Sequence, residues 1–228
     1  MAVRARHGDQ AAMNRVAPLL LALLLAGCGS KPKAPEWQLE AHGSLERYVK
    51  AFMASDTRVE GAEFVRAREQ LARTADAGLV ARAELTRCAL RVASLVFEPC
   101  VGFEALRVDA PPAELAYADY LAGRALPRDA ALLPPAHRAV AAASADAAAV
   151  KAIDDPLARL VAAGVLFETG RASPDVLQLA VDTASAQGWR RPLLAWLGAQ
   201  ARRAELAGAQ QEAERLRRRM ELLLGQPK

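Results

Sequence analysis

The chain is poor in the groups from which most catalytic and metal sites are built. It holds three histidines and three cysteines in 228 residues. Past residue 28 the histidines are His42 and His137, which lie far apart and do not form the H-x-x-x-H spacing typical of zinc ligands. We therefore expect each histidine at the surface or at a helix end, and we predict neither a metal nor a cofactor.

Motifs of the common enzyme classes are missing as well. No P-loop, G-x-S-x-G or G-x-G-x-x-G sequence occurs. Calcium loops need denser oxygen ligands and a turn glycine, so we interpret Asp155 of the group Asp146, Asp154 and Asp155 as a helix cap. No carboxylate sits in an apolar context that indicates a raised pKa. We predict no catalytic residue and no enzyme activity.

Strand signals are also absent. Aromatic residues make up 5% of the chain, and no segment alternates between apolar and polar residues for long enough to need a strand. Alanine, leucine and arginine, all strong helix formers, are abundant. These features predict an all-α fold of antiparallel helical hairpins, stacked as a small solenoid-like or bundle domain.

Signals for the start and the end of helices are clearest in the last third of the chain. Asp155-Pro156 and Ser173-Pro174 are typical helix starts, because the first residue caps and proline suits the first turn. Glycines at 170, 188 and 208 indicate helix ends. The clearest predicted hairpins cover 155–188 and 190–224. Earlier in the chain we predict Ser44 as an N-cap.

The longest apolar run, Val16 to Leu25, is too short to span a membrane. It has ten residues, about half of what a spanning helix needs. It follows Arg15 and precedes Leu25-Ala26-Gly27-Cys28, an arrangement typical of a cleaved secretory signal. These last four residues resemble the lipobox of lipoproteins from Gram-negative bacteria. The resemblance implies cleavage before Cys28, with diacylglyceryl on its thiol and a further acyl chain such as palmitate on its amine.

The same resemblance sets the expected organisation and location. Residues 1–27 would be the signal peptide, starting at Met1 or Met13, 28–36 a lipidated tether, and 37–228 a single helical domain. Gly29, rather than aspartate, follows the cysteine, which favours the outer membrane over the inner one and a periplasm-facing domain. Without the signal the net charge falls from +4 to about +2, so we expect no nucleic-acid partner.

The two remaining cysteines, Cys88 and Cys100, are twelve residues apart. In an oxidising compartment such a pair is a disulfide candidate. Two buried free thiols are the alternative, whereas a redox-active pair would need the C-x-x-C spacing that the chain lacks.

Two sets of residues are candidates for an interaction surface. Tyr117 and Tyr120, three apart on a predicted helix, would share one side and line a groove for a sugar or peptide, or else pack in the core. Arg215, Arg218 and Arg219 lie off the apolar stripe of the last helix, where a basic docking face or a solvated face are the alternatives.

The last hairpin also carries weak repeat landmarks. Leu197-Gly198, Gly208, Ala213 and Pro227 resemble positions of tetratricopeptide or Sel1-like repeats. Resemblance to helical-repeat envelope lipoproteins implies a membrane-anchored adaptor or scaffold that binds an envelope protein. The alternatives are a structural lipoprotein without a discrete ligand, and a protein that binds or cleaves an envelope polymer such as peptidoglycan.

Overall fold

The computed structural model describes residues 34–142 and 146–225, which form helices and turns without a strand. The predicted all-α class is therefore confirmed. The fold described below is that of the second of the chain's two units, which begins at Glu36. The predicted signal peptide and Cys28 lie outside the described residues.

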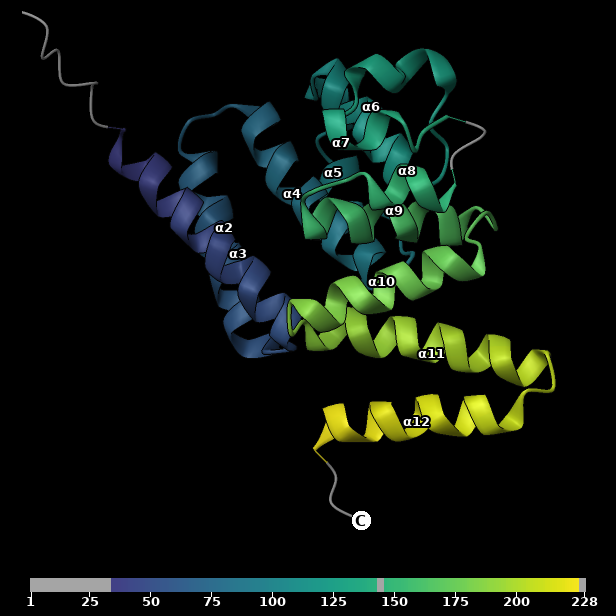
Figure 1. Cartoon of the computed structure of the whole chain (residues 1–228). Helices are drawn as coiled ribbons and strands as arrows, with labels where there is room; N and C mark the ends of the chain where they lie inside the picture. Colours follow the sequence, from purple (N-terminus) through teal and green to yellow (C-terminus); the bar gives the residue numbers. More distant parts are fainter. Residues whose placement is uncertain (1–33, 143–145, 226–228) are drawn as a thin grey trace, which may run out of the picture. The chain divides into compact units, whose positions relative to one another are not determined.

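Helices follow one another with short connections throughout the second unit (Figure 1). The first part contains α2 (Glu36–Ala54), α3 (Thr57–Ala72), α4 (Ala77–Ala93), α5 (Val101–Glu104), the 3-10 turn η1 (Arg107–Asp109) and α6 (Pro112–Leu121). The second part contains the 3-10 turn η2 (Pro127–Leu132), α7 (Pro135–Arg138), α8 (Ala147–Lys151), α9 (Pro156–Glu168), α10 (Pro174–Ala186), α11 (Arg190–Leu206) and α12 (Gln210–Leu224).

Local signals fix the ends of the later helices. The side chains of Asp155 and Ser173 accept hydrogen bonds from the backbone N–H groups of Ala158 and Val176, so both predicted N-caps are confirmed. The predicted stops are confirmed too, because the glycines at 170, 188 and 208 adopt φ of 69°, 64° and 73°. This left-handed conformation ends a helix at little cost only when the residue is glycine.

The predicted cap Ser44 is wrong. Ser44 lies buried in the middle of α2, which begins at Glu36, and its hydroxyl accepts a hydrogen bond from Arg47 Nη2 at 3.0 Å. Serine at an interior position is tolerated here because a neighbouring side chain satisfies its oxygen.

Helix α4 forms the centre of the domain. It packs against α2, α3, α5, α6 and α9. Small side chains make this possible, since Ala81, Ala89 and Ala93 of α4 are all buried. The backbones of α9 and α4 come close together at Gly164 of α9, where an added Cβ would lie 2.3 Å from the carbonyl oxygen of Val92. The abundance of alanine therefore serves close helix packing as well as helix formation.

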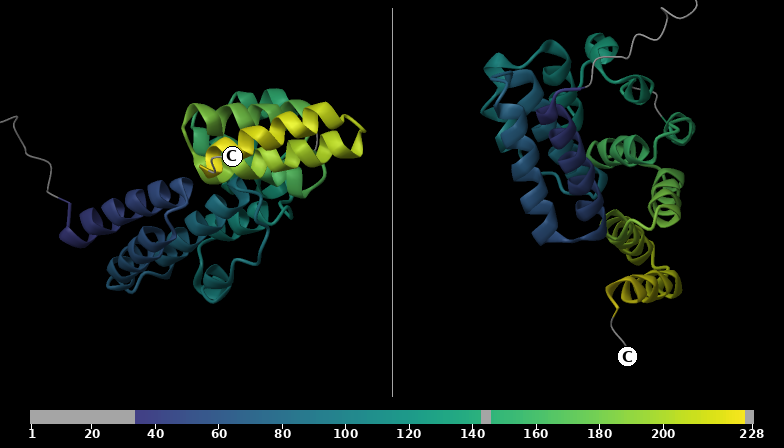
Figure 2. Two further views of the ribbon diagram at one scale, coloured as in Figure 1. Left: turned by 90° about the horizontal axis from the view of Figure 1, so that it is seen from below. Right: turned by 90° about the vertical axis from the view of Figure 1, so that its left-hand side faces the viewer.

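The last four helices stack in chain order (Figures 1 and 2). α9 packs on α10, α10 on α11, and α11 on α12. These helices occupy the two segments, 155–188 and 190–224, in which the clearest hairpins are predicted. Successive packing of this kind is the arrangement of a helical solenoid.

Two sets of long-range contacts connect α11 to earlier helices, one to α2 and α3 and the other to α4. Arg191 of α11 pairs with Glu60 of α3 at 2.7 Å, and its guanidinium lies 3.9 Å from the ring centroid of Phe52. Trp196, fully buried, donates its indole N–H to the carbonyl oxygen of Ala93 at 3.0 Å. The domain thus adds contacts between distant segments to the neighbour-to-neighbour packing of a solenoid.

Candidate binding pocket

A pocket of 520 Å³ lies beside the central helix. Arg82 and Thr86 of α4 form one side, Glu114 and Tyr117 of α6 form another, and Arg138 adds a third charged side chain. Its apolar walls are Leu85, Leu132, Leu133, Pro134 and Pro135. We call this site the Tyr117 pocket. A largely apolar concavity with a few polar groups is the usual form of a ligand site, and its volume falls within the common range of roughly 300–1,000 Å³.

Both predicted tyrosines lie at this site, at different depths. Tyr117 is half-buried and lines the pocket, whereas Tyr120 is fully buried behind it. Their rings stack with centroids 6.1 Å apart. The imidazole of His137 completes an aromatic cluster, with its centroid 5.5 Å from that of Tyr117 and 4.9 Å from that of Tyr120. Only Tyr117 is therefore placed to contact a bound molecule.

His137 lies in the last turn of α7, one of the two positions predicted for it, and it is buried rather than at the surface. His137 is 3% exposed. Burial lowers the pKa of its imidazole from 6.5 to about 4, and the charge of Asp155 opposes this with a smaller effect. Burial likewise raises the pKa of Tyr117 and of Tyr120. Among the described residues, neither His137 Nδ1 nor the Tyr120 hydroxyl has a hydrogen-bond partner. All three rings are therefore neutral at pH 7.

The carboxylate of the pocket is held by an arginine. The Glu114 side chain is 6% exposed, and its Oε1 accepts a hydrogen bond from Arg82 Nε. Arg138 Nε is bound differently, donating to the carbonyl oxygen of Leu133 at 2.9 Å. Arg82 and Glu114 neutralise each other, so Arg138 leaves the site with one surplus positive charge.

The candidate arginines of the last helix form a separate surface. Arg215, Arg218 and Arg219 lie on α12, which packs through Ala213 and Leu216 onto α11. Arg215 binds Glu212 through two hydrogen bonds of 2.8 and 2.7 Å. The structure therefore does not bring these arginines together with Tyr117, which belongs to α6.

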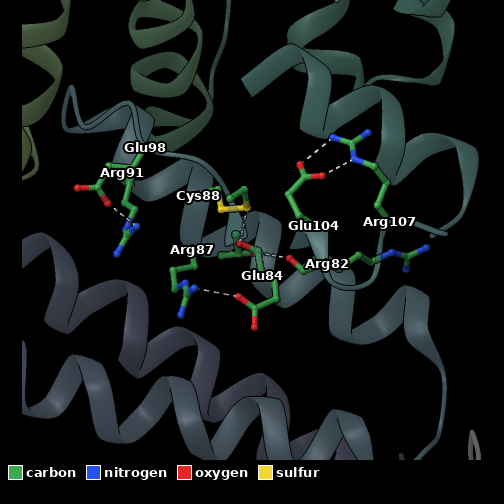
Figure 3. Close-up of a disulfide and its surroundings, with 10 residues drawn as sticks. Arg82, Glu84, Arg87, Cys88, Arg91, Glu98, Glu104 and Arg107 are labelled. Atoms are coloured by element: carbon green, nitrogen blue, oxygen red, sulfur yellow. Dashed lines mark hydrogen bonds and ion pairs between the residues drawn. A yellow bond between two sulfur atoms is a disulfide. The ribbon is translucent and has the colours of Figure 1, made fainter. Parts of the chain in front are cut away.

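Cys88 and Cys100 form a disulfide, as predicted, with their Cα atoms 5.9 Å apart. It joins α4 to the residue before α5, and Figure 3 shows it among ion pairs such as Arg87 with Glu84, at 3.3 Å. The carboxylate of Glu84 lies against α5 so closely that a Cβ on Gly102 would come within 2.0 Å of its Oε2. The disulfide thus fixes α5 over a buried charge.

Sequence reasoning missed Glu114, Arg82 and Arg138. One local signal was present, because Glu114 precedes Tyr117 by three residues and therefore shares its side of the helix. A glutamate on a largely apolar helix face indicates a buried pair. Its arginine lies 32 residues earlier, and no local pattern reveals such a partner.

No protein-family model, curated protein or solved structure matches the chain. Within 34–142 and 146–225, no cluster of three or more histidine, cysteine, aspartate or glutamate side chains is suited to holding a metal ion. In the same ranges, no helix combines the length and the apolar character that crossing a membrane requires.

Proposed function

We propose that this protein is a lipid-anchored adaptor of the bacterial cell envelope, whose helical domain binds another protein without catalysis. The observation that carries the proposal is the Tyr117 pocket, an open and mainly apolar site whose one carboxylate, Glu114, is neutralised by Arg82.

The anchor rests on the lipobox-like sequence that ends at Cys28. Each buried CH₂ of an acyl chain contributes about 0.8 kcal/mol, so two or three chains hold a protein firmly on a bilayer. The segment Gly29 to Pro35 extends at most roughly 25 Å. We place the domain on the periplasmic side of the outer membrane, where the anchor keeps the pocket close to membrane-bound partners.

Crosslinking in living cells tests this proposal. The protein at its native level and its Cys28→Ala variant are crosslinked, and their partners are identified by mass spectrometry. We expect one envelope protein to be enriched with the wild type and lost with the variant. A salt wash of the membranes supplies the second readout, in which only the wild type is retained.

Two results would count against the proposal. Retention of the Cys28→Ala variant on washed membranes would refute the proposal that Cys28 carries the anchor. Absence of any enriched protein partner from wild-type samples would remove the adaptor function.

A further inference from the structure

The Tyr117 pocket combines three surfaces that a single ligand would contact together. The ring of Tyr117 supplies a half-buried aromatic wall. Leu132 is 44% exposed and, with Pro134 and Pro135, forms an apolar rim. Arg138 stands on the same rim.

The charge of the site selects for an anionic group. The charges of Arg82 and Glu114 offset each other through their ion pair, whereas no ion pair of Arg138 occurs within the described ranges. Its one hydrogen bond, from Nε to the carbonyl oxygen of Leu133, uses one of the five N–H donors of a guanidinium. The other four suit a carboxylate, which arginine binds in a bidentate manner.

We propose that the Tyr117 pocket binds an extended acidic peptide segment of a partner protein. A carboxylate of the segment pairs with Arg138, and a neighbouring apolar side chain packs on Tyr117 and Leu132. Aromatic and arginine side chains are the residue types that dominate binding energy at protein interfaces. This inference rests on the proposed adaptor function and gives the chemistry of its partner.

Titration calorimetry of the purified full chain tests the inference with defined probes. The first probe is an acetylated, amidated hexapeptide of alternating leucine and glutamate. Two matched probes replace glutamate by lysine, or leucine by serine. We expect saturable binding of the first probe and an affinity at least tenfold lower for each of the others, because each lacks one of the two contacts.

Variants locate the binding. Arg138→Glu reverses the charge of the rim and is expected to weaken the leucine–glutamate probe at least tenfold. Arg128→Glu is the matched control, since Arg128 lies on η2 with a side chain 79% exposed and does not line the pocket. Ala113→Trp fills the pocket from an exposed position and should abolish binding while the melting temperature stays unchanged.

Several outcomes would overturn the inference. They are equal binding of the lysine probe, an equal effect of the two charge reversals, and binding that survives in the Ala113→Trp variant. Binding of chitotriose with no binding of any peptide would assign the pocket to a carbohydrate instead. A cellular partner whose crosslinks do not reach the pocket would refute the inference and leave the adaptor function standing. Specific peptide binding without any cellular partner would refute the adaptor function and leave only the peptide preference of the pocket.

Discussion

Single residues without side chains decide how closely the central helices approach. Gly164 lets α9 meet the backbone of α4, and Gly102 leaves room for the carboxylate of Glu84. Neither glycine has a φ in the left-handed region. These glycines are needed because there is no room for a side chain. Protein interiors are packed to the density of organic crystals, so neighbouring atoms cannot easily move to make room.

Gly164→Ala is therefore expected to destabilise the protein by about 1–3 kcal/mol, because its Cβ forces α9 away from Val92. Gly61→Ala in α3 is the control, since nothing lies within 4 Å of its Cβ. There alanine should raise stability by roughly 0.5–1 kcal/mol through helix propensity. Urea denaturation of both variants measures the difference, and equal effects would contradict the packing role of Gly164.

His137 gives the stability a pH dependence. Its pKa is lowered from 6.5 to about 4 in the folded protein. Between these values the unfolded chain binds more protons, so the stability contribution is complete above pH 6.5 and declines as the pH falls towards 4. We expect the free energy of unfolding to drop by about 2 kcal/mol from pH 7 to pH 5.

The His137→Phe variant should lose this pH dependence, as measured by denaturation at both values. The buried carboxylate of Glu63 does not mask the effect in this range. Burial alone would raise the pKa of Glu63, but Arg47, Ser44 and Arg66 lower it below 4.5, so its contribution is lost only at lower pH. An unchanged slope in His137→Phe would assign the dependence to other groups.

At the scale of helices, buried glutamates mark the interfaces of the first half of the domain. Arg47 Nε of α2 forms an ion pair with Glu63 Oε2 of α3 at 3.0 Å. Arg68 Nε of α3 forms one with Glu84 Oε1 of α4 at 2.9 Å. Glu114 of α6 is paired in the same way with an arginine of α4. In each case an arginine of one helix pairs with a glutamate of the next long helix in the chain. Because an unpaired buried charge is costly, these pairs penalise any shift in register.

Removing both partners of Glu84 tests this. Its side chain is 3% exposed, while Arg68 and Arg87 are 46% and 32% exposed. The double variant Arg68→Ala/Arg87→Ala should lose about 2–4 kcal/mol, less than a fully buried pair would because water reaches the arginines. Arg202→Ala, at a pair 3.6 Å long with a side chain 71% exposed, should cost under about 0.5 kcal/mol. Similar losses in thermal denaturation would disprove the special role of Glu84.

The disulfide acts on the connection from α4 to α5. It closes a loop across a sequence separation of twelve, which stabilises the fold by about 3 kcal/mol in the chain-entropy model. We expect Cys88→Ser to lower the melting temperature of the oxidised protein, and to show no further decrease when a reductant is added. Two alkylatable thiols in the native wild type would contradict the bond.

At the scale of the whole molecule, local signals made the helices predictable and left their assembly open. Asp155, Ser173 and the stop glycines act within one turn of themselves, so the sequence displays their effect directly. His137 shows the opposite case, because its burial depends on two tyrosines of another helix. Of the charged and aromatic residues that line the pocket, only Tyr117 was predicted, since Arg82 and Glu114 meet through the packing of α4 on α6.

The tie between Trp196 and Ala93 has a consequence for the order in which the chain folds. The two residues are 103 positions apart, and contacts of such separation form late because a long loop must close first. Until that loop closes, α4 lacks the indole that satisfies its last turn, so the first half of the chain has an incomplete core.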